Sequence, residues 1–196
     1  MRVLITGGDG FIGRHLTAAL LERGDSIYVI DNHITSSPSI EHSRLTRIEA
    51  DVCDLNRVIP NWEADVIVHL ASVAIPKLYM ESPQTVISPN VLGTMRVCEY
   101  AERCGARVIF SSTSEVYGTA QSIPIMEDHP LHAQSPYAAT KIAADQMALS
   151  YHRSFGLPVS VVRPFNTFGP RQSMRAVIPT IINQAQSGKG EISLGA

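Results

Sequence analysis

Short runs of β-branched and other apolar residues alternate with longer amphipathic stretches, and this alternation limits the possible folds more than any other feature. The runs are VLIT, SIYVID, LTRIEA, DVIVHL, RVIF and VSVVRP, which begin at Val3, Ser26, Leu45, Asp65, Arg107 and Val159. Strands this uniformly apolar are expected where helices cover both faces of a sheet. The pattern therefore predicts an α/β fold with a doubly wound parallel sheet and helices on both faces.

The amphipathic stretches predict four helices, over residues 11–23, 86–104, 137–155 and 177–187. A glycine that can end a helix follows each of them, at Gly24, Gly105, Gly156 and Gly188. Residues 119–135 are polar, contain two prolines and predict a long functional loop.

The chain has 196 residues, which fits one domain. EISLGA, from Glu191, begins like another strand and then stops. We therefore expect one nucleotide-binding domain over residues 1–190 and the start of a truncated substrate-binding region over residues 191–196. The net charge is −2 and no run of like charge occurs, which favours neither nucleic acid nor an anionic membrane as a partner.

The three cysteines, Cys53, Cys98 and Cys104, have neither the paired spacing of metal ligands nor a CxxC motif. We therefore expect no metal site. The sequence also has no signal peptide and no long apolar span, so the expected location is the cytoplasm.

TGGDGFIG, between the first predicted strand and helix, places Gly7, Gly10 and Gly13 in a GxxGxxG spacing. Glycines there allow a tight turn and let the backbone approach a pyrophosphate at the helix N-terminus. Asp31 ends the second strand about 20 residues later, where a carboxylate can accept hydrogen bonds from a ribose diol and repel a 2'-phosphate. These features predict a Rossmann-like domain that binds NAD in preference to NADP. Asp51 and Val52 either hold the adenine or belong to a plain turn.

Two later motifs supply reactive groups. SPYAATK places Tyr137 and Lys141 four residues apart, on one face of a helix, and the ammonium is expected to lower the pKa of the phenol. SSTSEVYG contains Thr113, Ser114 and Glu115 directly after a strand. Alone, these hydroxyl residues are better explained by a loop whose side chains form hydrogen bonds with its own backbone. We interpret His69, His129 and His132 as structural or solvated.

The order of the motifs resembles the extended short-chain dehydrogenase/reductase family, in particular its NAD-dependent nucleotide-sugar epimerases, dehydratases and decarboxylases. TGGDGFIG, HLAS, NVLGT, SSTSEVYG, SPYAATK and RPFNTFGPRQS follow one another in the family order, from Thr6 to Ser173. Two departures stand out. Asp9 occupies a turn position that is usually a small residue, and we expect the small C-terminal substrate lobe of the family to be missing after Ala196.

The resemblance implies a role for each matching residue. Contacts to NAD are implied for Gly7, Gly10, Phe11, Ile12, Gly13, Asp31, Asn32, Asp51, Val52, Leu70, Ala71, Ser72, Tyr137 and Lys141. The catalytic residues would be Thr113, Ser114, Glu115, Tyr137 and Lys141, and those at the substrate Asn166 and Arg171. The family also implies a homodimer in which the helices at 86–104 and 137–155 form a four-helix packing.

All reactions of this group begin with oxidation of a sugar at C4. A 4,6-dehydratase needs a carboxylate to remove the C5 proton, a UDP-glucuronate decarboxylase also has Glu at the position of Glu115, and a 4-epimerase needs no carboxylate there. SPYAATK and RPFNTFGPRQS favour a 4,6-dehydratase, whereas HLASVAIPKLYMESP is closer to the decarboxylases. A non-catalytic NAD-binding scaffold is the remaining alternative, but it would not need Thr113, Tyr137 and Lys141 together.

Overall fold

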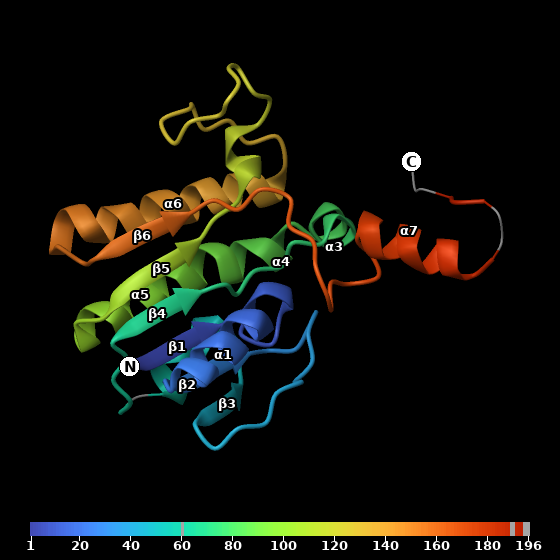
Figure 1. Cartoon of the computed structure of the whole chain (residues 1–196). Helices are drawn as coiled ribbons and strands as arrows, with labels where there is room; N and C mark the ends of the chain where they lie inside the picture. Colours follow the sequence, from blue (N-terminus) through green and yellow to red (C-terminus); the bar gives the residue numbers. More distant parts are fainter. Residues whose placement is uncertain (60, 189–190, 194–196) are drawn as a thin grey trace. The chain divides into compact units, whose positions relative to one another are not determined.

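The computed structural model describes residues 1–59, 61–188 and 191–193, and it divides into two compact units, Met1–Phe165 and Asn166–Ala196. The first unit contains a parallel sheet with the strand order β3-β2-β1-β4-β5-β6 (Figure 1). The strands are β1 (Arg2–Thr6), β2 (Ser26–Asp31), β3 (Leu45–Glu49), β4 (Val66–His69), β5 (Arg107–Ser111) and β6 (Val159–Val162). This is the doubly wound order, so the predicted fold class and strands are confirmed.

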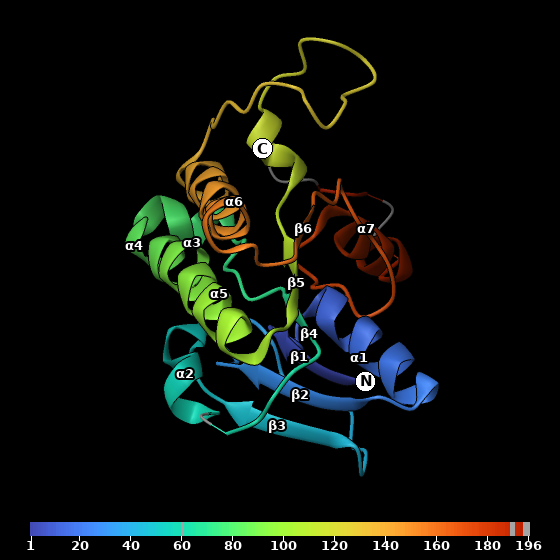
Figure 2. The same cartoon turned by 90° about the vertical axis from the view of Figure 1, so that its left-hand side faces the viewer.

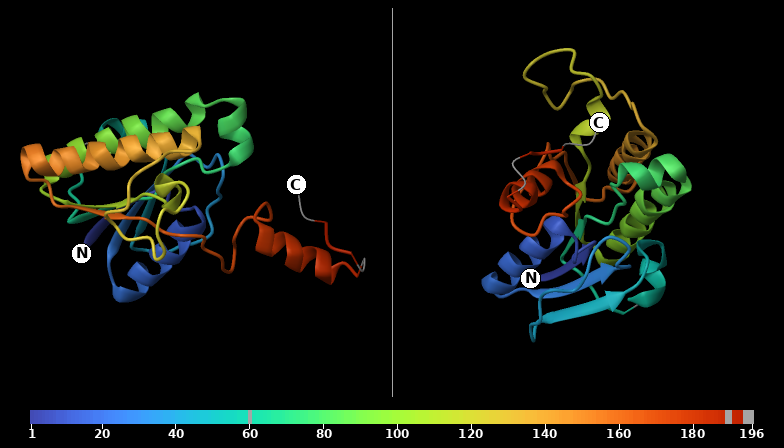
Figure 3. Two further views of the ribbon diagram at one scale, coloured as in Figure 1. Left: turned by 90° about the horizontal axis from the view of Figure 1, so that it is seen from above. Right: turned by 90° about the vertical axis from the view of Figure 1, so that its right-hand side faces the viewer.

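The helices of the first unit are α1 (Phe11–Arg23), α2 (Leu55–Val58), α3 (Pro76–Glu81), α4 (Gln84–Ile87), α5 (Gly93–Cys104) and α6 (Pro136–Phe155), with the short turns η1 (Val52–Asp54), η2 (Ser88–Leu92) and η3 (Ser114–Tyr117). Helix α1 covers one face of the sheet, and α5 and α6 cover the other (Figures 2 and 3). The predicted helices at 11–23 and 137–155 are confirmed, the second starting one residue earlier.

Alternating side chains of the central strands build one core on each face of the sheet. Val3 and Ile5 of β1 pack in a cluster with Leu21 of α1. Leu4, between them, joins a larger cluster that includes Val97 of α5. Period-two alternation sends neighbouring residues of a strand to opposite faces, so a strand covered on both faces must be apolar throughout.

The predicted helix at 86–104 is three segments instead of one. Between α4 and α5 lies η2, a π-helical turn, in which each backbone hydrogen bond spans one residue more than in an α-helix. Asn90, in this turn, is buried. Helices α2 and α3 were not predicted because segments of this length are too short to display helical periodicity.

The second unit contains α7 (Val177–Gln186), which confirms the predicted helix at 177–187 apart from its last residue. After it, the Gln184 side chain holds Ser193 through two hydrogen bonds, one to its carbonyl and one from its N–H. Residues 191–193 form no strand, and the rest of EISLGA lies outside the described residues, as does the predicted domain boundary at residue 190. No described helix has the length and apolar character needed to cross a membrane.

Candidate active site

A cleft opens at the carboxyl ends of β1, β2 and β4. In sheets of this type, ligands bind at the point where the strand order reverses, which is here between β1 and β4. The cleft is lined by eight of the residues predicted to contact the cofactor, namely Gly7, Gly10, Asp31, Asn32, Val52, Leu70, Ala71 and Ser72. Its lining also includes residues that were not predicted, among them Thr35 and Ser36 of the loop after β2.

Each glycine of the turn between β1 and α1 has a distinct steric role. Gly7 is left-handed, with φ +71°, and a Cβ on it would lie 2.7 Å from the backbone nitrogen of Ala71. A Cβ on Gly13 would lie 2.3 Å from the carbonyl oxygen of Gly7, so only glycine lets α1 pack this closely on the turn. Gly10 lines the cleft, and the nearest atom to its Cβ would be 3.2 Å away. This cradle fits a dinucleotide pyrophosphate.

The carboxylate of Asp31, at the end of β2, is held by three donors of the chain. Its Oδ2 accepts a hydrogen bond from the Asp9 backbone N–H (3.1 Å), and its Oδ1 accepts from the His33 N–H (3.0 Å) and the Ser36 hydroxyl (2.7 Å). These bonds fix the carboxylate at the edge of the cleft. A carboxylate in this position fits the ribose diol of NAD, since the remaining lone pair, on Oδ2, can accept one more hydroxyl proton.

Asp51 and Val52 lie together at the start of η1, but their side chains point to different partners. The Asp51 carboxylate accepts from the Cys53 N–H at 2.9 Å and from the Asn32 side-chain amide at 3.1 Å. Val52 is buried and lines the cleft. Asp51 is therefore a capping residue in this structure, and contact of either residue with adenine stays a prediction.

The ends of β4 and β5 meet the start of α6 in a cluster of hydroxyl groups. The Tyr137 hydroxyl interacts with the side chains of Ser72 and Thr113. Thr113 also accepts a hydrogen bond from the Glu115 N–H at 3.2 Å, which starts η3. The loop and catalytic interpretations of SSTSEVYG are thus compatible. The Thr113 hydroxyl accepts a hydrogen bond from the local backbone and also interacts with Tyr137.

The predicted effect of Lys141 on Tyr137 is wrong for this structure. Burial, together with the nearby Glu115 carboxylate, raises the pKa of Tyr137 to about 12. Burial also lowers the pKa of Lys141 to about 8, although Asp145 opposes this change. The Lys141 ammonium donates to the backbone oxygen of Ser111 at 2.7 Å. The spacing of Tyr137 and Lys141 along a helix reveals neither that both are buried nor that a strand carbonyl accepts the hydrogen bond of the ammonium.

Glu115, in η3, is near enough to the phenol of Tyr137 to affect its pKa. The residue is exposed as a whole, but its carboxyl is partly enclosed, and this burial raises the pKa of the carboxyl above its ordinary value. Its charge in turn raises the pKa values of Tyr137 and Tyr79. The Tyr79 ring stacks on that of Tyr137, with centroids 5.8 Å apart. A carboxyl and a phenol that interact electrostatically and have displaced pKa values form a candidate acid–base pair.

Residues 3–196 match the model of the NAD dependent epimerase/dehydratase family. The chain belongs to this family. Its description as NAD dependent confirms the predicted cofactor, and membership confirms the resemblance on which the residue roles depend.

Individual members of the family differ in activity. UDP-glucuronic acid decarboxylase 6 of Arabidopsis thaliana is 37% identical to the chain over an alignment of 202 positions, which covers 96% of this chain and 58% of that protein. The solved UDP-N-acetylglucosamine 4-epimerase from Methanobrevibacter ruminantium M1 has a TM-score of 0.91 and 32% identity, covering 100% of this chain and 66% of that one. The dTDP-glucose 4,6-dehydratase DesIV from Streptomyces venezuelae, solved with NAD and TYD bound, has a TM-score of 0.89 and 32% identity, with coverage of 96% and 63%. The chain thus spans a little over half to two thirds of these proteins.

Two further residues of this family member take part in the site but were not predicted. Asn90, in the π turn η2, accepts a hydrogen bond from the Ser72 hydroxyl at 2.7 Å and donates to the Thr140 hydroxyl at 2.8 Å. It therefore links the cleft to α6, one turn from Tyr137. Tyr79, on α3, stacks on Tyr137. The motif NVLGT drew attention to Asn90, but only the fold reveals its partners; no signal in the sequence indicated Tyr79.

Several predicted residues lie away from the described cleft or in the second unit. Phe11 and Ile12 are in the first turn of α1, and Ser114 is in η3. Asn166 and Arg171 are exposed residues of the second unit, and their contact with substrate stays a prediction.

His69 is structural, as predicted: it lies between the hydroxyls of Thr6 (2.6 Å) and Thr94 (3.1 Å), and burial lowers its pKa to about 3. Among the described residues, no group of three or more His, Cys, Asp and Glu side chains is arranged to hold a metal ion.

Proposed function

We propose that the chain is the NAD-binding and catalytic part of an enzyme that modifies a nucleotide-linked sugar through a 4-keto intermediate, and that the enzyme is a sugar-nucleotide 4,6-dehydratase. The observation that supports this proposal best is the position of Glu115. Its carboxyl lies close enough to Tyr137 to raise the pKa of the phenol, and partial burial raises its own pKa. A second acid–base group beside the tyrosine is required for elimination and superfluous for epimerisation.

In the first half of the proposed reaction, Tyr137 takes the proton of the sugar 4-hydroxyl, and Thr113 shares a hydrogen bond with that hydroxyl. Bound NAD supplies the acceptor and later the donor of the hydride. The phenol must become phenolate for this step, and a pKa of about 12 disfavours phenolate at neutral pH. A positively charged Lys141, on the same face of α6, would favour the phenolate.

In the second half, the new ketone at C4 makes the proton at C5 acidic. Glu115 takes this proton while the hydroxyl at C6 leaves as water. A carboxyl with a raised pKa is a better base than an ordinary one, because proton transfer to it is less uphill. Ser114 takes the place of the aspartic acid that dehydratases acting on deoxythymidine-linked hexoses use as the acid, so Glu115 itself or water would protonate the leaving hydroxyl.

UDP-glucuronate decarboxylase is the second candidate. It is favoured by the 37% identity to the decarboxylase of Arabidopsis thaliana, which exceeds the identities to the epimerase and the dehydratase. In that reaction the C4 ketone is β to a carboxylate, and carbon dioxide leaves without loss of a proton from carbon. The same Tyr137 step would begin it, while Glu115 would not act as a base at C5.

Product mass separates the candidates. The full chain would be incubated with NAD and, separately, UDP-glucuronate, UDP-N-acetylglucosamine and dTDP-glucose, and the sugar nucleotides analysed by mass spectrometry. A dehydratase yields a product lighter by one water, and a decarboxylase one lighter by carbon dioxide. A product of unchanged mass with inverted stereochemistry would reject both in favour of a 4-epimerase, and NAD binding without any product would favour the scaffold alternative.

The variant Glu115→Gln tests the role of the carboxyl directly. The amide preserves size but cannot accept the C5 proton, so water loss should fall by about a hundredfold or more while the 4-keto sugar still forms. Loss of water and exchange of the C5 proton with deuterium oxide would both be followed. Glu127→Gln, in the loop at 119–135, is the matched control and should retain turnover. Unchanged water loss in Glu115→Gln would contradict the assigned role.

A further inference from the structure

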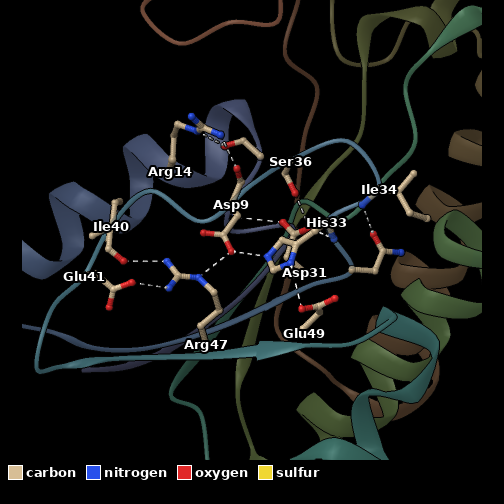
Figure 4. Close-up of polar contacts among 12 residues, drawn as sticks. Asp9, Arg14, Asp31, His33, Ile34, Ser36, Ile40, Glu41, Arg47 and Glu49 are labelled. Carbon is tan, nitrogen blue, oxygen red and sulfur yellow. Dashed lines mark hydrogen bonds and ion pairs between the residues drawn. The ribbon is translucent and has the colours of Figure 1, made fainter.

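Asp9, the unusual residue of the glycine-rich turn, is the centre of a buried charge cluster (Figure 4). Its Oδ2 atom accepts a hydrogen bond from the Arg47 Nε–H at 2.8 Å and lies 3.0 Å from His33 Nε2. The Asp9 side chain is 4% exposed, and those of Arg47 and His33 are each 16% exposed. One carboxylate thus engages two basic side chains from β3 and from the loop after β2, away from bulk water.

This cluster adjoins the carboxylate that is proposed to hold the adenosine ribose. The backbone N–H groups of Asp9 and His33 both donate to Asp31, one to each of its oxygens. Residues 9 and 33 therefore flank Asp31 on two sides. A substituent on a ribose hydroxyl that is bonded to Asp31 would lie next to both residues, and a 2'-phosphate is such a substituent.

The two basic side chains do not reach the cleft as the chain is folded. The described residues that line it include Asp31 and Ser36 but neither Arg47 nor His33. Arg47 is drawn away further by the carbonyl oxygen of Ile40, to which its Nη2 donates at 2.9 Å, and by Glu41. A guanidinium that was free at this position would be a strong ligand for a phosphate, because its planar donors match phosphate oxygens.

We propose that Asp9 is a second determinant of cofactor choice, which keeps Arg47 neutralised and turned away from the ribose 2' position and so makes the site reject NADP. The inference rests on the proposed NAD-dependent function and on the predicted contact of Asp31 with the ribose. Asp31 repels a 2'-phosphate directly, whereas Asp9 acts by removing the cation that would attract one. Asp9 is on this view a positioning residue for Arg47 and not a contact of the cofactor.

The two members of the ion pair should have opposite effects when they are changed singly. Asp9→Asn removes the negative charge and leaves Arg47 uncompensated, so the affinity for NADP relative to NAD should rise by about fivefold or more. Arg47→Met leaves the Asp9 carboxylate uncompensated, so the relative affinity for NADP should fall by about threefold or more. In the double variant Asp9→Asn/Arg47→Met the two changes should cancel, and the ratio should return to within about twofold of the parent's.

Isothermal titration calorimetry of the full chain with NAD and with NADP measures these ratios, and circular dichroism establishes that each variant is folded. Asp128→Asn, an exposed residue of the loop at 119–135, makes the same change in net charge and is the control; its ratio should equal the parent's. Should Asp9→Asn not fold, Arg47→Met decides alone, because the direction of its effect is specific to the proposal.

A purely structural role for Asp9 predicts something different, namely that each variant weakens NAD and NADP by the same factor. Ratios within twofold of the parent's in the folded single variants would therefore overturn the proposal. Asp31→Asn distinguishes this outcome from failure of the proposed ribose site. If Asp31→Asn binds NAD as tightly as the parent does, Asp31 does not hold the ribose, and both the ribose assignment and the inference about Asp9 are rejected.

Discussion

The nucleotide-binding and reactive regions of the first unit satisfy their polar groups in different ways. In the nucleotide-binding region, around the turn after β1, the Asp31 carboxylate already has three donors from the chain itself. In the reactive region, around the start of α6, burial holds the pKa values of Tyr137 and Lys141 away from their ordinary values. In the first region the fold itself supplies hydrogen-bond donors to the carboxylate. The second region contains groups whose charge states depend on the ligand that binds beside them.

Tyr137→Phe is expected to have the largest effect and tests whether the two regions are separable. The variant deletes the proton acceptor in the reactive region, so turnover should fall by about a thousandfold. The affinity for NAD should change by less than about threefold, because the change deletes one hydroxyl and little contact surface. Steady-state kinetics and calorimetry measure the two quantities.

Tyr151→Phe, on the same helix, is the control for this comparison and should retain turnover. A large loss of NAD affinity in Tyr137→Phe would mean that the two regions are coupled and that the comparison is too simple. Turnover within tenfold of the parent's would remove Tyr137 from the centre of the reaction.

Gly10→Val makes the reciprocal change and should weaken NAD binding by about a hundredfold. Gly10 has an extended backbone, with φ −70° and ψ 179°, which valine can adopt, and its Cβ would meet no protein atom closer than 3.2 Å. The added side chain would instead occupy the space of the pyrophosphate. Ala19→Val, on the exposed side of α1, is the control for the effect of valine on the helix, and tight NAD binding by Gly10→Val would place the pyrophosphate elsewhere.

The smallest expected effect is a dependence of stability on pH that comes from Lys141. Its pKa is about 8 in the folded chain, against an ordinary value of 10.5, because burial disfavours the charged form. Between these values the unfolded chain retains a proton that the folded chain has released, so unfolding takes up a proton. The contribution of Lys141 to the free energy of unfolding should therefore rise with pH in this window, by at most about 1.4 kcal/mol per pH unit, and show no such slope below it.

Urea unfolding of the parent and of Lys141→Met at several pH values between 8 and 10 measures this slope as the difference between the two proteins. Tyr137, whose pKa is raised from 10 to about 12, contributes with the opposite sign above pH 10, so the series ends there. Equal slopes for parent and variant would mean that Lys141 titrates as an exposed lysine does.

The strands and long helices were predictable because their signals are local. Apolar runs located the six strands, and the glycines at 24, 105 and 156 marked the ends of α1, α5 and α6, which they cap in left-handed conformations. The carboxyl-end positions of Gly7, Asp31 and Ser72 followed from the doubly wound order, since parallel strands bring these ends to one edge.

The unpredicted features depend on contacts between residues far apart in the sequence. Asp9 was noted only as a departure from the usual small residue, because its partners His33 and Arg47 are 24 and 38 positions away. The pKa of Tyr137 was predicted in the wrong direction for the same reason. The helical spacing of Tyr137 and Lys141 was correct, but the burial of the phenol and its nearness to Glu115 arise from packing among α3, η3 and α6.

The π turn at Ser88–Leu92 has a consequence for how the length of this protein can vary during evolution. Removing one residue from the turn would restore a regular α-helix, but it would also remove the wider turn in which Asn90 lies and so shift that residue along the helix. Asn90 would then no longer reach both Ser72 and Thr140. Insertions and deletions should therefore accumulate among homologues in the loop at 119–135 and be absent from residues 84–104. The length of this interrupted helix should thus be the same throughout the family.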